Sequence, residues 1–243
     1  MGAMVTLPEL WPPAAVVVQT PRLELRWPGE DDLRALAEVA SQGVHDEDTM
    51  PFNVPWTRGA PDEVARSVLQ WNWRCRGEWT PAKWSWSGVV VVDGEVVGTQ
   101  GVQASDFAVC RTVETGSWLG RRHQARGIGK EMRAAVLHLA FAGLDATRAE
   151  TGAYEHNQPS LGVTRALGYR PNGDRLMAVE GRCQRELLFV IDRETWSARR
   201  RDDITLAGVA EARALFGADP PGDVPGDASG DVPADVEAGS PSG

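Results

Sequence analysis

A short basic segment that contains two glycines constrains the fold of this chain more than any other feature. GRRHQARGIGKEM, residues 120–132, follows an extended run from Thr112 to Leu119 and leads into a helical pattern. Up to Gly143, apolar residues recur there with the helical repeat: Ile128, Met132, Ala135, Val136 and Leu139. A helix start has unpaired backbone N–H groups and partial positive charge. We therefore predict an anion site at this strand-to-helix junction, and a phosphate suits it best.

The side chains around the junction narrow the choice of phosphate ligand. Arg121, Arg122, Arg126 and Lys130 add positive charge, so a pyrophosphate is the economical interpretation. A nucleoside triphosphate loop needs Ser or Thr after its Lys and a Gly five residues before its second Gly. Here Glu131 follows Lys130, and Gln124 occupies the earlier position. A dinucleotide fingerprint needs a third glycine where Met132 stands, so that class is excluded too.

The remaining periodicities predict how the junction is embedded in a fold. SGVVVVDGEVVGTQGVQ, residues 87–103, places two β-branched runs around Asp93-Gly94, a strong hairpin signal. The other predicted strands are residues 23–26, 147–154, 175–179 and 184–191, and the other predicted helices are residues 30–40, 61–76 and 159–167. This order of elements predicts an α/β (α+β) domain with a mostly antiparallel mixed sheet, because a doubly wound fold alternates strands and helices throughout.

Composition divides the chain into four predicted parts. Residues 1–19 are an N-terminal extension, 20–198 the main domain, 199–217 a C-terminal helical segment, and 218–243 a disordered acidic tail rich in Gly and Pro. The formal charge is −9, and the six acidic residues of the tail leave only −3 for the rest. Because nucleic-acid binding needs a concentrated positive surface, we expect no nucleic-acid partner.

Cysteines and hydropathy suggest the compartment. Cys75, Cys110 and Cys183 are odd in number and far apart, which suits a reducing cytoplasm and argues against a zinc site, so no metal is expected. The longest early apolar run, Ala14 to Val18, is much shorter than the roughly 20 residues of a membrane helix. We predict a cytoplasmic protein that has no membrane partner.

The junction motif, Gln124-x-x-Gly127-x-Gly129 after a central strand, resembles that of the GCN5-related N-acetyltransferase (GNAT) family. VETGSWLG, residues 113–120, looks like the family's fourth strand. YEHNQPSLGVTRALGYRP, residues 154–171, resembles the segment after its fifth strand. TMPFNVPWT, residues 49–57, resembles the acceptor side of the branch related to the ribosomal-protein acetyltransferases RimJ and RimL. The resemblance covers about residues 20–195.

The resemblance implies a fold and a cofactor. The fold would be a mostly antiparallel sheet of about seven strands flanked by about four helices. Acyl-coenzyme A would be bound along the fourth strand and at the helix start. The implied binding residues are Trp118, Leu119, Arg121, Gln124, Ala125, Arg126, Gly127, Ile128, Gly129, Lys130, Asn157 and Ser160. Acetyl-CoA is the expected donor. Some relatives use succinyl-CoA, whose extra carboxylate would meet Arg121 or another basic group, but no residue decides between the two donors.

Two residues are candidates for the proton transfers of acyl transfer to an amine. Many family members carry a Tyr seven residues after the Asn, where this chain has Thr164, whereas Ser160 matches the serine that the RimL-like branch is thought to use. Ser160 is therefore assigned to protonate the leaving thiolate, although Asn157 and Ser160 are equally suited to cap a helix. Glu114 shares one strand face with Gly116 and Trp118 and is the candidate base.

Several alternatives to these assignments stay open. Glu150, His45 and Asp46 are rival bases, and an exposed strand carboxylate explains Glu114 at least as well. We expect His123 and His138 to be solvent-exposed rather than catalytic. Six of the ten tryptophans lie between residues 56 and 86. Trp56, Trp84 and Trp86 are assigned to the acceptor entrance, with core packing or a dimer contact as the competing interpretation.

The predicted function is transfer of an acyl group from acyl-CoA to a primary amine of a small molecule or peptide, by direct attack in a ternary complex. The competing hypothesis is an acyl-CoA-binding sensor of the same fold without catalysis. A homodimer is a family-level expectation. Neither the acceptor nor the role of the acidic tail follows from the sequence.

Overall fold

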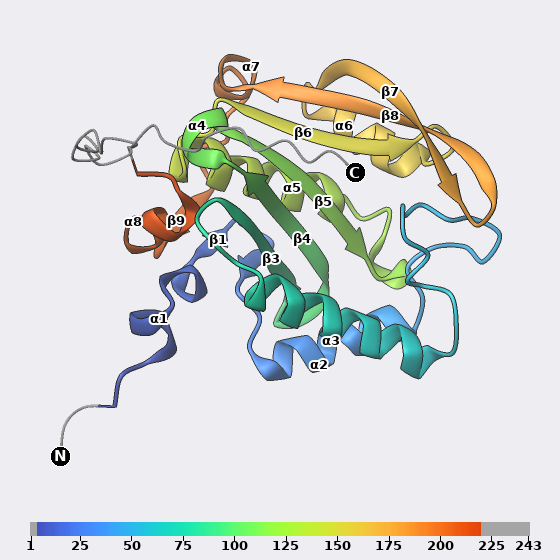
Figure 1. The fold of residues 1–243 in the computed structure, drawn as a ribbon, viewed down its shortest axis with the longest axis horizontal. Helices are drawn as coiled ribbons and strands as arrows, with labels where there is room; N and C mark the ends of the chain where they lie inside the picture. Colours follow the sequence, from blue (N-terminus) through green and yellow to red (C-terminus); the bar gives the residue numbers. More distant parts are fainter. Residues whose placement is uncertain (1–3, 220–243) are drawn as a thin grey trace, which may run out of the picture.

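One nine-stranded sheet runs through the structure, a computed structural model that describes residues 4–219 (Figure 1). Its strands are β1 Val17–Gln19, β2 Glu24–Arg26, β3 Lys83–Val92, β4 Glu95–Ser105, β5 Thr112–Leu119, β6 Arg148–Tyr154, β7 Arg170–Val179, β8 Arg182–Asp192 and β9 Thr205–Ala207. The strand order is β7-β8-β6-β5-β4-β3-β2-β1-β9. The mixed, mostly antiparallel sheet predicted from the sequence is confirmed.

Four helices of nine or more residues flank the sheet, as expected: α2 Glu30–Ser41, α3 Pro61–Gly77, α5 Ile128–His138 and α6 Gln158–Ala166. A π-helical turn, Leu139–Gly143, continues α5. Single-turn helices fill the connections: α1 Leu7–Leu10, α4 Phe107–Cys110, α7 Arg193–Ser197 and α8 Val209–Ala212, with 3-10 turns at Pro12–Ala15, Arg121–His123 and Arg213–Phe216.

Two strands were not predicted, which corrects the expected count of about seven. β1 and β9 have three residues each and pair with each other, and β1 also pairs with β2. A three-residue strand is too short to show alternation, so its pairing partner defines it. β9 also corrects the prediction that residues 199–217 are simply helical. The expected disordered tail lies outside the described residues from position 220 onward.

β5 and β6 form the one parallel pair within residues 4–219, and they pair over only part of their length. The ladder joins Thr112–Glu114 to Arg148–Glu150 and then stops, although each strand continues to pair with its other neighbour. Beyond Glu114 and Glu150 the two strands separate (Figure 1). A gap therefore opens in the middle of the sheet, next to the start of α5.

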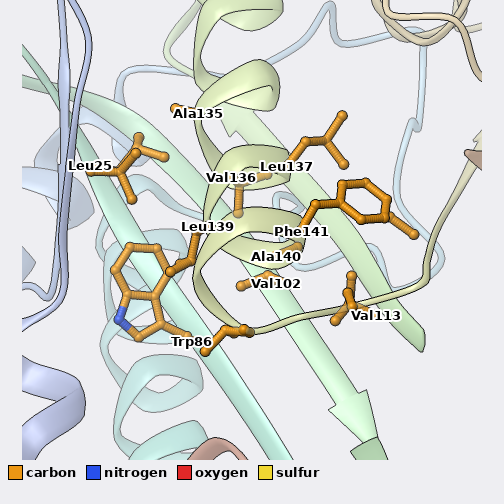
Figure 2. Close-up of a cluster of buried hydrophobic side chains, with 14 of the residues drawn as sticks. Leu25, Trp86, Val102, Val113, Ala135, Val136, Leu137, Leu139, Ala140 and Phe141 are labelled. Carbon is orange, nitrogen blue, oxygen red and sulfur yellow. The ribbon is translucent and has the colours of Figure 1, made fainter. Parts of the chain in front are cut away.

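The face of the sheet toward α5 carries the main core. Leu25, Trp86, Val102 and Val113 gather around the turns that hold Val136 and Leu139, as Figure 2 shows. All are nearly or fully buried. The apolar stripe predicted for residues 127–143 supplies the helix side of this core.

The opposite face is covered only in part. α2 and α3 pack Leu36, Val64 and Val68 on Val89 and Val91, which forms a second, smaller core. Farther along the sheet this face carries Gln103, Glu114 and Gly116 on β4 and β5, and both Glu114 and Gly116 are exposed. These elements leave an open polar surface beside the β5–β6 gap.

Candidate functional site

The strand-to-helix junction has the backbone geometry of an anion site. β5 ends at Leu119, and Gly127 precedes α5 with φ of 79°, a left-handed conformation that glycine adopts without strain. Ala125 is also left-handed, at φ 59°. A Cβ on Gly129 would lie 3.6 Å from Val163, so the start of α5 lies close to α6. No side chain caps the start of this 11-residue helix, so its first N–H groups keep their capacity to bind an anion.

The four basic side chains at the junction divide into two pairs. Arg121 Nη2 is 2.5 Å from Asp46, and Arg122 forms an ion pair with Glu95. Arg126 and Lys130 are exposed, and neither side chain forms an ion pair within residues 4–219. Arg126 and Lys130 therefore supply the accessible positive charge beside the helix start.

Gln124 acts as a tether in this structure. Its amide nitrogen donates to the carbonyl oxygens of Val44 at 2.8 Å and Leu119 at 2.9 Å. It thereby fixes the end of β5 to residues 42–60, which connect α2 to α3 and which we call the 42–60 loop. Sequence reasoning assigned Gln124 to the cofactor but missed this contact, since nothing in the sequence pairs position 124 with position 44.

The 42–60 loop is also fastened on its far side. Tyr154, at the end of β6, donates from its hydroxyl to Asn53 Oδ1 at 2.6 Å. Arg58 binds Glu180, in the turn between β7 and β8, at 2.7 Å. With Asp46 and Arg121, these contacts hold the loop across the ends of β5 and β6. The loop therefore borders the open polar surface.

Asn157 and Ser160 lie together at the start of α6. Asn157 Oδ1 accepts a hydrogen bond from the backbone N–H of Ser160 at 3.2 Å, so the capping role considered for Asn157 is present. In the described part of the chain the Ser160 hydroxyl has no hydrogen-bond partner, and the side chain is partly exposed. Thr164 is fully buried, and its hydroxyl is also unpaired within residues 4–219.

Glu114 lies on the open polar surface. It accepts a hydrogen bond from Gln103 Nε2 at 3.0 Å and is level with Glu150 of β6. Glu150 binds Arg148 at 2.6 Å, which leaves Glu114 as the less neutralised of the two carboxylates. A Cβ on neighbouring Gly116 would meet no atom within 4 Å, so space remains beside Glu114. No hydrogen bond joins Glu114 to Ser160 in the structure as described.

The rival bases have structural partners. His45 Nε2 is 2.6 Å from Thr57 Oγ1, and Asp46 binds Arg121. The expected exposure of His123 and His138 is wrong, because both rings are buried. Burial lowers the pKa of both histidines below 6.5, and a neighbouring arginine adds to the effect in each case. These rings stay neutral near pH 7.

Of the three tryptophans assigned to the acceptor, only Trp56 borders the site. Its ring centroid is 5.5 Å from that of Trp118 on β5 and 5.1 Å from that of Phe52. Trp84 and Trp86 need correction, because they are 2% and 0% exposed in the main core. Trp84 packs on Phe107 and Phe216, and Trp86 donates to the carbonyl of Pro13. Neither ring presents a surface to an acceptor.

A further buried side chain beside the gap was not predicted. Arg133 of α5 is 4% exposed and reaches Ser117 on β5 and Thr151 on β6. In sequence it is one basic residue inside an apolar helical stripe, and only the position of the β5–β6 gap shows what it faces.

Neither a metal cluster nor a membrane-spanning helix is found among residues 4–219. The described part contains no group of three or more His, Cys, Asp or Glu side chains that could hold a metal ion. None of its helices combines the length and apolar character that crossing a membrane requires. Cys75 is partly buried, Cys110 and Cys183 are exposed, and all three thiols are free.

Comparison with known proteins gives one family and a set of similar folds. A family model described as Acetyltransferase (GNAT) domain matches residues 22–170. RimJ of Mycobacterium smegmatis, solved in complex with a CoA disulfide, is 20% identical with a TM-score of 0.58, over 77% of this chain and 96% of that one. RimL, described as an alpha-N-protein acetyltransferase in complex with coenzyme A, is 18% identical with a TM-score of 0.56, over 74% and 99%. A GCN5-related N-acetyltransferase from Brucella melitensis is 18% identical with a TM-score of 0.60, over 76% and 81%.

Proposed function

The chain belongs to the acetyltransferase (GNAT) family, and we propose that it transfers an acyl group from acyl-CoA to a primary amine by direct attack in a ternary complex. The observation that carries this proposal is the start of α5, where no side chain caps the backbone amides and the cations Arg126 and Lys130 are exposed. It lies beside the part of β5 that has no ladder partner in β6. The pyrophosphate would bind at the helix start. The pantetheine arm would run along Trp118 and Leu119 into the gap.

The side chains around the gap support a direct transfer. Backbone N–H groups of β5 would polarise the thioester carbonyl. Glu114 would take a proton from the attacking amine through water, a C–N bond would form, and the C–S bond would break. The unpaired Ser160 hydroxyl would protonate the departing thiolate. Acetyl-CoA is the default donor from family membership, and succinyl-CoA is the alternative.

The acceptor site would be the open polar surface bordered by Trp56 and the 42–60 loop. Its exposed carboxylate Glu114 favours a cationic acceptor, which a primary amine is at neutral pH. RimL's description as an alpha-N-protein acetyltransferase supports a peptide amine over a small molecule. The four-part division of the chain, the homodimer and the cytoplasmic location remain part of this proposal.

A turnover assay tests the proposal against a non-catalytic acyl-CoA sensor. Ser160→Ala and Glu114→Gln are each compared with the wild type for CoA affinity, by calorimetry, and for free-thiol release with a library of amines and peptides. We expect both variants to keep CoA affinity and to lose turnover. Unchanged turnover in both variants would remove the catalytic assignment. A wild-type protein that binds acyl-CoA but releases no thiol with any acceptor would be a sensor.

A further inference from the structure

Arg133 is a buried charge without a counter-charge. Its Nη1 donates to Thr151 Oγ1 at 3.1 Å and its Nη2 to Ser117 Oγ at 3.2 Å. Its Nε has no hydrogen-bond partner in the described part of the chain, although it is buried. No carboxylate of residues 4–219 forms an ion pair with it, and two neutral hydroxyls satisfy only part of its five N–H donors.

The other two buried charges have ion partners, in contrast to Arg133. Glu131 binds Arg22 at 2.6 Å and Glu186 binds Arg175 at 2.6 Å. A guanidinium held in a protein interior without an anion costs several kcal/mol, and an apolar residue of similar volume would avoid that cost. Every other buried position of α5 from Met132 to Leu137 carries an apolar residue. The unpaired Arg133 therefore indicates an anion that is bound during function.

The position of Arg133 identifies where this anion would come from. The β5–β6 ladder ends at Glu114 and Glu150, and the guanidinium spans the two strands just beyond, at Ser117 and Thr151. In the proposed function the pantetheine arm runs along Trp118 and Leu119. Its acyl end would then lie at Ser117, next to the guanidinium. The pyrophosphate would lie at the other end of the arm, too far away to neutralise the Arg133 guanidinium.

We propose that Arg133 binds a carboxylate at the far end of the acyl group, so that the donor is a short dicarboxylic acyl-CoA such as succinyl-CoA or malonyl-CoA. The carboxylate accepts from Nε and from the remaining N–H groups, which neutralises the buried charge. The transfer chemistry is unchanged, and the product amide carries a free carboxylate. This inference rests on the proposed function, because it needs the acyl chain to enter the β5–β6 gap.

Calorimetric titration without an acceptor tests the inference independently of turnover. Acetyl-, malonyl-, succinyl- and glutaryl-CoA are titrated into the full chain, into Arg133→Met and into Arg34→Met. Arg34 is a 72%-exposed arginine on α2 and serves as the matched control. We expect the wild type and Arg34→Met to bind one dicarboxylic acyl-CoA at least about tenfold more tightly than acetyl-CoA. That ratio corresponds to the free energy of one charge-assisted hydrogen bond. Arg133→Met is expected to lose that preference while it still binds acetyl-CoA.

The outcomes separate this inference from the proposed function. Equal wild-type affinity for all four donors, or a preference that survives in Arg133→Met, overturns the carboxylate subsite and leaves the acyltransferase proposal intact. Absence of binding to every acyl-CoA overturns both. If Arg133→Met does not fold, Thr151→Val carries the test, because it removes a hydroxyl that holds the guanidinium. A preference undiminished in Thr151→Val then counts against the subsite.

Discussion

The two faces of the central strands perform different tasks with alternating residues. On β3, Trp84 and Trp86 are buried on the face toward α5. Ser85 and Ser87, which alternate with them, lie on the other face and are partly exposed. On β5, buried Val113 alternates with exposed Glu114 in the same way. Neighbouring residues of one strand therefore belong to the core face or to the opposite face of the sheet by parity alone. Substitutions one residue apart should separate stability from activity.

The largest expected effect is on the core face. Trp86→Ala removes a fully buried indole, and we expect the free energy of unfolding to fall by about 3–5 kcal/mol. Ser87→Ala, on the opposite face of the same strand, is the matched control and should cost less than about 1 kcal/mol. Urea denaturation followed by tryptophan fluorescence measures both. Similar losses for the two variants would contradict the division of β3 into a core face and an opposite face that is less buried.

Turnover should depend on the other face. Glu114→Gln keeps the shape of the side chain beside Gln103 but removes the carboxylate, and we expect kcat to fall by about a hundredfold if this group is the base. Stability should stay within about 0.5 kcal/mol, because the side chain is exposed. Glu211→Gln, an exposed carboxylate on α8, is the control for a general charge effect. A kcat for Glu114→Gln that matches that of the control would mean that another group acts as the base.

Trp84 and Trp86 were assigned to the acceptor entrance because they belong to the tryptophan-rich region 56–86, and the predicted hairpin begins only at residue 87. The hairpin around Asp93-Gly94 fixes Val92 opposite Glu95, and simple alternation from there would place Trp84 opposite Gln103. A bulge between Val90 and Val91 shifts the register by one residue, so that Trp84 lies opposite Ala104 and Ser85 opposite Gln103. The extra residue is Val97 on β4, so the alternation of β3 is unbroken and Trp84 and Trp86 share the face of buried Val90.

Local patterns predicted the junction and the order of the long elements, because β5, α5 and the hairpin each contain enough residues to show their period. The roles of the residues beside the β5–β6 gap could not be predicted in this way. The role of Arg133 depends on where the β5–β6 ladder stops, and that of Gln124 depends on a loop 80 residues away. Such contacts join residues that are far apart in the chain, and they depend on tertiary packing. No local sequence pattern at either residue indicates them.

A smaller, site-specific effect is expected at the edge of the open surface. Trp56→Ala removes a ring that packs on Trp118. One aromatic contact contributes about 0.5–1.5 kcal/mol, so we expect the acceptor KM to rise by about two- to tenfold with little change in CoA affinity. Trp71→Ala, a half-exposed tryptophan on α3, is the control. Steady-state kinetics with the best acceptor from the library measures the change. An equal KM for both variants would remove Trp56 from the acceptor site.

The smallest effect concerns a buried histidine on the side of α5 away from the open surface. Burial lowers the pKa of His138 below the 6.5 of an unfolded chain, and Arg200 lowers it further. Below pH 6.5 the unfolded chain binds a proton that the folded chain does not, so the contribution of neutral His138 to stability is complete above pH 6.5. It declines as the pH falls from 6.5 toward the folded-state pKa.

His138→Gln should therefore flatten the decline in the free energy of unfolding below pH 6.5, as measured by urea denaturation at a series of pH values. His156→Gln, at an exposed histidine, is the control. CoA affinity should be the same in both variants, because His138 packs on Trp196 rather than at the junction. A slope unaltered in His138→Gln would mean that the pKa of the ring is the same in the folded and the unfolded chain. The face of α5 that carries it would then be more open to solvent than the core face of the sheet.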